Sequence, residues 1–311
     1  MIFTCTMNPS LDYYMDFEQE ITCGALSRST MEYCEPGGKG VNVSIVLNNL
    51  GIDSCALGFI GGFPKDHYLE LLSRYEHIRP DFTVIRGDTR INVKCTGAAR
   101  TELNGAGPYI TEADMADLKT KVSQLGPEDI FVLAGSVQRY LADDAEDMLR
   151  SALGRGVKVI LDTDPQMTGR LLGCHPFMIR MTAEEIGRMF GEEPSAKADV
   201  IRLARKAYDA GCGRVIVRYD RFSVLLVCAE GIFEAVMPDE DREITIVGAG
   251  DSMTAGFLAD HLRAGDASEN FRFGFACSCA TAYSKGLATG AKIRSVLPQI
   301  RTAGIDGICE M

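Results

Sequence analysis

Apolar residues fall into short β-branched runs that alternate, along most of the chain, with longer segments of helical period. Short runs predict buried strands, and apolar residues that recur every three or four positions predict helices. The expected strands are residues 2–6, 54–59, 130–134, 157–162, 177–179, 215–218, 223–228 and 232–236. A first helix is expected after a glycine turn at 36–40 and ends at about residue 50. The other expected helices cover residues 112–124, 142–153, 182–190, 196–210, 250–263 and 267–285. This alternation predicts an α/β fold in which helices cover both faces of a mostly parallel central sheet.

Two further segments, residues 11–35 and 87–107, mix polar and apolar residues in short stretches and predict half-exposed strands. In the second segment, Arg90, Asn92 and Lys94 fall on one face of a strand, which places two cations and an amide together. We expect both segments to form a small β layer that projects from the main body. The chain has no internal repeat and no low-complexity linker, so residues 1–311 are interpreted as one domain.

A glycine turn follows the β-branched run at residues 244–247 and contains Gly248, Ala249 and Gly250, with Asp251 directly after it. The next residues have helical period, so the turn lies at a helix N-terminus, where free N–H donors and the helix dipole favour an anion. Glycine lets a phosphate approach the backbone closely, and a carboxylate here can take a proton from a hydroxyl that attacks this phosphate. Asp251 is also interpretable as a simple N-cap, and this stretch alone leaves both interpretations open.

The other glycine turn contains Gly37, Gly38 and Lys39 and opens a helix in which Asn42 lies one turn further on. Its spacing is not that of a Walker loop. One interpretation is a left-handed turn with Lys39 in solvent. The other is a close approach of the backbone to a polar ligand, with the Asn42 amide offering both a donor and an acceptor.

Composition narrows the class of protein. The formal net charge of −11 argues against non-specific binding to nucleic acid or to a membrane surface, but it allows a local basic pocket for an anionic metabolite. Eleven cysteines without paired spacing, and the lack of a positively charged leader followed by an apolar region, indicate a reducing cytoplasm. The four histidines lack ligand spacing and predict no histidine-built metal site. No apolar run reaches the roughly 18 residues of a membrane span.

The chain contains four motifs, at residues 8–12, 37–42, 89–94 and 247–252, whose order and separations are similar to those of a known family. Together they resemble the ribokinase-like carbohydrate kinases of the PfkB type, and within them the branch of 1-phosphofructokinases and tagatose-6-phosphate kinases. The resemblance covers nearly the whole chain. It implies a central sheet between helices, a β lid over the sugar formed by the two mixed segments, homodimers with clasped lids, and the use of ATP and Mg²⁺.

Carried over residue by residue, the resemblance implies a catalytic set at the second glycine turn. Asp251 resembles the base that deprotonates the acceptor hydroxyl. The N–H groups of Ala249, Gly250 and Asp251, after Gly248, resemble the anion hole that stabilises charge on the transferred phosphoryl group. These roles agree with the chemistry of phosphoryl transfer, which depends on positioning and preorganised hydrogen-bond donors more than on covalent catalysis.

The resemblance also implies a sugar-phosphate site. Asp12, Gly38 and Asn42 are similar to residues that bind the sugar hydroxyls. The residues implied to bind the rest of the substrate, including the phosphate that it already bears, are Gly37, Lys39, Arg90, Lys94 and Ser136. A convergent set of cations favours a sugar phosphate over a plain sugar, since about two negative charges must be offset.

Two stretches depart from the family pattern on the nucleotide side. Where the family usually has Lys-Pro-Asn followed by Glu, this chain has Arg180, Thr182 and Glu185. Where the family usually has a Gly-x-x-Gly loop, this chain has no glycine between Arg218 and Ser223, and a side chain at Asp220 is expected to crowd and repel a phosphate. Arg218 or Arg221 offers a substitute phosphate ligand, which would preserve activity with an altered nucleotide affinity. The residues implied to contact the nucleotide are Arg180, Thr182, Glu185, Arg218, Asp220, Ser223 and Ser284, with Glu185 also the expected metal ligand.

Two function hypotheses follow. The first is an ATP- and Mg²⁺-dependent kinase of a ketohexose phosphate, with fructose 1-phosphate to fructose 1,6-bisphosphate as the leading reaction and tagatose 6-phosphate as the nearest rival substrate. The second is a catalytically impaired sugar-phosphate-binding protein of the same fold, suggested by the altered nucleotide loops. A nicotinamide-dependent oxidoreductase is disfavoured, because no Gly-x-Gly-x-x-Gly follows the first strand.

Overall fold

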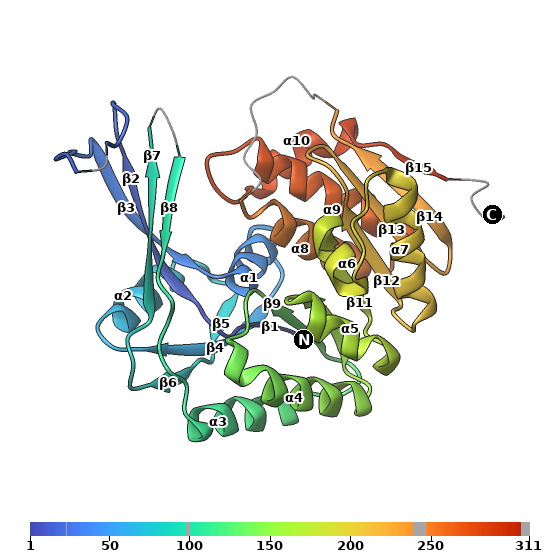
Figure 1. The fold of residues 1–311 in the computed structure, drawn as a ribbon, viewed down its shortest axis with the longest axis horizontal. Coiled ribbons are helices and arrows are strands. Elements are labelled where there is room, and N and C mark those ends of the chain that lie inside the picture. Colours follow the sequence, from blue (N-terminus) through green and yellow to red (C-terminus); the bar gives the residue numbers. More distant parts are fainter. Residues whose placement is uncertain (23, 98–99, 239–246, 306–311) are drawn as a thin grey trace.

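The structure is a computed structural model that describes residues 1–22, 24–97, 100–238 and 247–305. These residues form a large sheet between two layers of helices and a smaller second sheet beside it (Figure 1). The α/β class and the mostly parallel central sheet predicted from the sequence are therefore confirmed. The predicted strand at 244–247 lies, except for Val247, outside the described residues.

The large sheet has eleven strands in the part of the chain that the structure describes, and its centre is parallel. From one edge its order is β15 (Thr302–Gly304), β14 (Gly231–Val236), β13 (Ser223–Cys228), β12 (Arg214–Arg218), β11 (Met178–Thr182), β10 (Lys158–Asp162), β9 (Ile130–Ala134), β1 (Ile2–Thr6), β4 (Ser54–Gly61) and β5 (Ile78–Pro80), and β6 (Thr83–Ile85) pairs with β4. The strands from β12 to β5 are parallel, whereas β13, β14 and β15 extend the sheet in antiparallel fashion. The parallel strands are continuous apolar runs because helices cover both of their faces.

Helices form a separate hydrophobic cluster with each face of this sheet. One face packs against α3 (Glu112–Ser123), α4 (Ala142–Gly154), α5 (Pro165–Leu171), α6 (Ala183–Phe190) and α7 (Lys197–Asp209). The other packs against α1 (Lys39–Asn49), α8 (Ala249–His261), α9 (Ala267–Ala282) and α10 (Gly290–Val296). On β10, Val159 and Leu161 belong to the first cluster and Ile160 to the second, as strand alternation requires. None of the described helices is long and apolar enough to cross a membrane.

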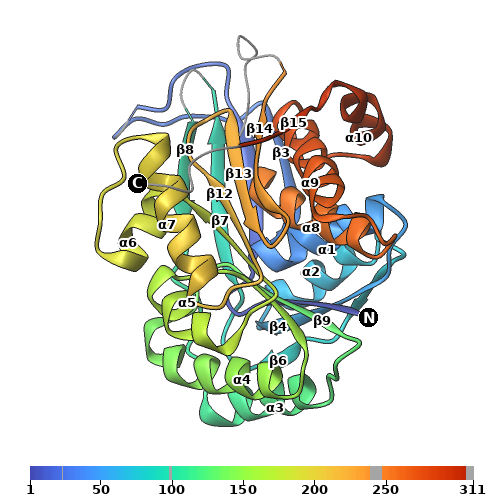
Figure 2. The ribbon, with the colours of Figure 1, turned by 90° about the vertical axis from the view of Figure 1, so that its right-hand side faces the viewer.

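The second sheet has the strand order β3 (Met31–Gly37), β2 (Ser10–Asp16), β7 (Arg90–Thr96) and β8 (Arg100–Asn104). It projects from the main body, and Figures 1 and 2 show it as a blue and blue-green layer beside the large sheet. Parallel pairing of β2 with β7 sets Asp12 opposite Asn92 and Tyr14 opposite Lys94. The two mixed segments of the sequence thus form one small sheet, as predicted.

Several short elements were not predicted from the sequence. They are α2 (Pro64–Leu72), α5, α10, β5, β6 and β15. The strands among them have three residues each, which is too short for a periodicity signal. Helix α5 did carry a start signal, because the Asp164 side chain accepts hydrogen bonds from the N–H groups of Gln166 and Met167, and Pro165 occupies the first turn. Helix α9 ends at Ala282 rather than at residue 285.

Candidate active site

A cavity of about 440 Å³ lies between the second sheet and the ends of β11 and β12, in front of the N-terminus of α8. Open α/β sheets place their ligand sites at the carboxyl ends of parallel strands, and this cavity has that position. The predicted site residues that line it are Asp12, Gly38, Lys39, Asn42, Arg90, Lys94, Arg180, Thr182, Glu185, Arg218, Ser223, Gly248, Ala249, Gly250 and Asp251. Residues from distant parts of the sequence thus meet in one place. We call the part of the cavity lined by the second sheet the β2–β7 half. The part lined by the antiparallel hairpin of β12 and β13 is called the β12–β13 half.

Helix α8 begins at the cavity with a left-handed glycine. Gly248 is the N-cap residue and has φ 74°, and a Cβ on it would lie 2.6 Å from Leu287 Cδ2, so a side chain here would be both strained and crowded. The cap has no side-chain hydrogen bond. The N–H groups of Ala249, Gly250 and Asp251 therefore occupy the first positions of the helix, where they have no intrahelical partners.

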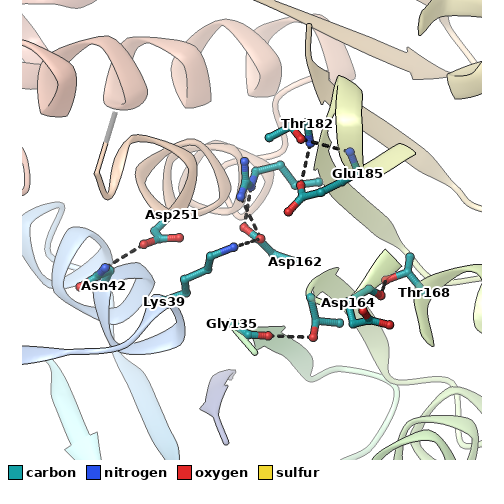
Figure 3. A network of polar contacts seen from close by, with 11 residues as sticks. Lys39, Asn42, Gly135, Asp162, Asp164, Thr168, Thr182, Glu185 and Asp251 are labelled. Carbon is teal, nitrogen blue, oxygen red and sulfur yellow. Dashed lines mark hydrogen bonds and ion pairs between the residues drawn. The ribbon is translucent and has the colours of Figure 1, made fainter. Parts of the chain in front are cut away.

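Asp251 is the third helical residue and is only 4% exposed. Its Oδ2 accepts a hydrogen bond from Asn42 Nδ2 at 2.8 Å, across from α1 (Figure 3). The side chain points toward Asn42 and does not cap its own helix. The N-cap interpretation of Asp251 is therefore wrong, and the carboxylate is one that lines the cavity.

A buried ion cluster lies beside this carboxylate. Asp162, at the end of β10, accepts hydrogen bonds from Arg180 Nε at 2.5 Å and Nη2 at 2.8 Å, and from Lys39 Nζ at 3.0 Å (Figure 3). A Cβ on Gly250 would lie 2.5 Å from Arg180 Cζ, so the guanidinium packs directly on the backbone of the α8 N-terminus. Glycine at this position leaves the space that the guanidinium occupies.

The charges in this cluster shift the pKa of both carboxyl groups, Asp251 and Asp162. Burial raises the pKa of Asp251 to about 6, and the negative Asp162 adds to this effect, while Asn42, Arg180 and Lys39 oppose it. Burial also acts to raise the pKa of Asp162, but the charges of Arg180 and Lys39 outweigh burial and hold that pKa below its ordinary value. A carboxyl group with a pKa near 6 is suited to act as a general base near neutral pH.

The β2–β7 half is built on a network around Asp12. Asp12 Oδ1 accepts hydrogen bonds from Ser10 Oγ at 2.7 Å and from Asn92 Nδ2 at 2.9 Å, and Asp12 Oδ2 forms an ion pair with Lys94 Nζ at 2.7 Å. Burial lowers the pKa of Lys94, but the neighbouring Asp12 charge outweighs it and raises that pKa. Arg90 is held by two backbone carbonyls, since Nε donates to Asn8 O and Nη1 to Gly105 O, both at 3.1 Å.

Lys39, Arg90 and Lys94 therefore converge on one cavity, as predicted. Each of them also has an acceptor in the protein, namely Asp162, backbone carbonyls and Asp12 respectively. Among all residues that line the cavity, basic side chains outnumber acidic ones, although the chain carries a net charge of −11. The cavity is thus a local basic pocket of the kind that the net charge of the chain allows.

Four predicted residues do not line the cavity. Gly37 packs against Asp12, because a Cβ on it would lie 2.5 Å from Asp12 Cγ. Ser136 lies in the loop after β9, outside the lining residues. The Ser284 Oγ donates to Ala280 O at 2.7 Å, just beyond α9. Asp220 accepts a hydrogen bond from the Phe222 N–H at 2.7 Å, so its carboxylate caps the hairpin turn, and its expected repulsion of a phosphate stays a prediction.

Other functional candidates were missed from the sequence. Asp162 is the main one, although its place at the carboxyl end of a buried strand was a usable signal. Ser10 was missed as well; with Asn92, which the sequence had placed beside Arg90 and Lys94, it fixes the orientation of Asp12. Among the described residues there is no group of three or more His, Cys, Asp or Glu that could hold a metal ion by itself.

Comparison with known proteins decides the family. The family model described as pfkB family carbohydrate kinase matches residues 7–294. The chain belongs to this family. It is a carbohydrate kinase, a phosphotransferase whose acceptor is an alcohol group. Sugar kinases of this family use ATP, typically with Mg²⁺.

Relatives of this kinase match over nearly its full length. It is 35% identical to the 1-phosphofructokinase of Bacillus subtilis, with 97% of this chain and 99% of the relative covered. It is 29% identical to the D-tagatose-1-phosphate kinase of Bacillus licheniformis, again with 97% and 99% covered. Among solved structures, phosphofructokinase-2 from Escherichia coli in complex with substrates and products superposes with a TM-score of 0.89 at 23% identity, covering 96% of this chain and 98% of that chain. At this identity the likeness concerns the fold alone.

Proposed function

We propose that this kinase phosphorylates a ketohexose phosphate with ATP and Mg²⁺, and that its main reaction converts fructose 1-phosphate to fructose 1,6-bisphosphate. The observation that carries the proposal is that Asp251 and the free N–H groups of α8 share one cavity with Lys39, Arg90 and Lys94. The similarity to 1-phosphofructokinases over nearly the full chain supports the same substrate class.

The geometry suits an in-line transfer. Asp251 takes the proton of the acceptor hydroxyl, and the resulting oxygen nucleophile attacks the γ-phosphorus as the bond to the β-phosphate oxygen breaks. The N–H groups of Ala249, Gly250 and Asp251, with the Arg180 guanidinium against Gly250, lie where they can stabilise the charge that develops on the transferred group. Asn42 fixes the base through its hydrogen bond at 2.8 Å.

The chemistry of the residues present fits a magnesium ion shared with the nucleotide. Magnesium binds through one or two carboxylates together with substrate phosphates and water. Glu185 lines the cavity, and its Oε2 accepts a hydrogen bond from the Thr182 N–H at 2.8 Å, which fixes the carboxylate at the start of α6. We propose Glu185 as the protein ligand; when bound, the ion offsets phosphate charge.

A substrate panel tests the proposed reaction. ADP release is measured with fructose 1-phosphate, tagatose 1-phosphate, tagatose 6-phosphate, fructose 6-phosphate and unphosphorylated fructose. Fructose 1-phosphate is expected to give the highest kcat/KM. The lack of turnover with every sugar phosphate, together with binding of fructose 1-phosphate, would instead favour the impaired sugar-phosphate-binding protein.

The pH dependence of kcat/KM is expected to report the state of Asp251. The base works only when deprotonated, so activity should fall as the pH drops through about 6, the raised pKa of this group. Asp162→Asn removes a neighbouring negative charge and is expected to move this acid limb to lower pH. The measurement is a pH–rate profile of both proteins with fructose 1-phosphate. An acid limb that stays in place in the variant would contradict the assignment.

Lys94 is expected to select for the phosphate of the sugar. Lys94→Met should raise the KM for fructose 1-phosphate by about tenfold to a hundredfold, because charge-assisted hydrogen bonds contribute about 1.5–3 kcal/mol. Lys206→Met, on α7 and outside the cavity, is the matched control and should leave this KM unchanged. Initial-rate kinetics decide the point. An equal rise of the KM for fructose 1-phosphate in both variants would show that Lys94 has no specific role in phosphate binding.

We also propose that the second sheet, formed within segments 11–35 and 87–107 of a single domain, acts as a lid and as the surface of a homodimer. Apolar side chains on it are exposed, with Met31 at 51%, Tyr33 at 39% and Leu103 at 61%. Light scattering should give twice the chain mass, and Leu103→Lys should lower the dimer fraction. A wild-type monomer at micromolar concentration would contradict this proposal.

The nine described cysteines are free thiols, which supports a cytoplasmic location.

A further inference from the structure

The hairpin turn between β12 and β13 uses two of its backbone N–H groups in hydrogen bonds within the turn. The Phe222 N–H donates to Asp220 Oδ1 at 2.7 Å, and the Tyr219 N–H donates to Ser223 O at 3.2 Å. Residues 214–230, all of which the structure describes, include no glycine and no residue with positive φ. An anion-binding nest of the αR–αL kind needs a left-handed residue, so this turn does not form a nest of that kind.

Two arginines of this hairpin line the cavity instead. Arg218 ends β12, and its Nη1 donates to Asp220 O at 3.3 Å, which orients the guanidinium across the turn. Arg221 lies in the turn with its Cζ 5.5 Å from the centroid of the Phe222 ring. Arg180, which is paired with Asp162, and Glu185 line the same half of the cavity, so the β12–β13 half contains three guanidinium groups.

An apolar compartment adjoins these cations. Ile216 lies two residues before Arg218 on the same side of β12, and it lines the cavity with Val224, Met237 and Phe275, all of them buried. Arg218 is also paired with Val224 in the register of the hairpin. An apolar pocket next to clustered guanidinium groups matches a molecule with a flat ring at one end and several phosphates at the other.

We propose that the phosphates of the nucleotide donor are bound by the side chains of Arg218 and Arg221, and not by the backbone of the β12–β13 turn. This inference rests on the proposed kinase function and names the residues that determine donor affinity. Guanidinium groups bind phosphate oxygens in pairs of hydrogen bonds and keep their charge at every working pH. Donor binding in this kinase is therefore strongly weakened by salt.

The test measures ATP–Mg²⁺ affinity by calorimetry, without turnover, in the wild type, Arg218→Ala, Arg221→Ala and the double variant. Each single change is expected to weaken binding by about tenfold or more, as the loss of charge-assisted hydrogen bonds implies. In initial-rate kinetics the KM for ATP should rise with the dissociation constant, while the KM for fructose 1-phosphate stays within about twofold. The double variant should also lose most of the salt dependence of ATP binding.

Arg188→Ala is the matched control, because Arg188 is exposed near the end of α6 and does not line the cavity. It should bind ATP as the wild type does, and thermal unfolding should show that every variant is folded. Wild-type affinity in the double variant would overturn the inference. Arginine-dependent ATP binding without turnover of any sugar phosphate would uphold it and refute only the kinase proposal.

Discussion

Asp251→Asn is expected to lower kcat for fructose 1-phosphate by about a hundredfold to ten-thousandfold, the usual contribution of a general base. An amide of the same shape cannot take the proton of the acceptor hydroxyl. The carboxylate is 4% exposed and oriented by Asn42, whereas the neighbouring Asp162 carboxylate is engaged by Arg180 and Lys39. Fructose 1-phosphate should still bind, because Lys39, Arg90 and Lys94 are unchanged. Initial-rate kinetics and calorimetry separate the two effects.

Asp260→Asn is the matched control for this experiment. Asp260 lies on the same helix, near its C-terminal end, and does not line the cavity. Its replacement should leave kcat close to the wild-type value. Full activity in Asp251→Asn would remove this carboxylate from the reaction, and an equal loss in Asp260→Asn would show that the effect comes from the stability of α8.

Asp162→Ala is expected to destabilise the protein by about 3–5 kcal/mol, measured by urea unfolding. Asp162 and Arg180 are both buried, with exposures of 2% and 8%, and removing the carboxylate leaves the guanidinium charged and unpaired. Lys39, whose side chain is 41% exposed, can turn to water and contributes little to the loss. The ion pair therefore matters for stability mainly because breaking one side of it is costly.

A double variant distinguishes this cause from a simple cavity. Asp162→Leu with Arg180→Met replaces the pair by apolar side chains and is expected to recover most of the lost stability. Activity should stay low, because the cation beside Gly250 is gone. A double variant as unstable as Asp162→Ala would point to packing around β10, and not to the unpaired charge, as the cause.

The sequence predicts the central elements because their signals are local. Strands β1 and β9 begin and end where predicted, since each is an apolar run closed by a turn. The glycine turn before Asp251 likewise predicts a helix N-terminus. The second sheet was also visible, because Arg90, Asn92 and Lys94 alternate along one strand.

The rest depends on contacts between distant residues. Asp162 is followed by Thr163 and Asp164 in an ordinary-looking polar turn, and only the fold brings Arg180 and Lys39 to it. The sequence likewise does not show that the Asp220 carboxylate accepts the Phe222 N–H within its own turn. Ser284 and Ser136 belong to loops whose paths depend on the packing of the elements around them. Local sequence patterns predict whether a segment is a helix or a strand. The direction in which a side chain points depends on tertiary packing.

The most direct test of the central claim is the structure of this kinase with fructose 1-phosphate and a non-hydrolysable ATP analogue. The acceptor hydroxyl is expected about 2.6–3.2 Å from a carboxylate oxygen of Asp251, with the γ-phosphate at the N–H groups of Ala249 and Gly250. The phosphate of the sugar should contact Lys39, Arg90 or Lys94. A sugar bound with its free hydroxyl far from Asp251, or with its phosphate away from these cations, would contradict the proposed reaction.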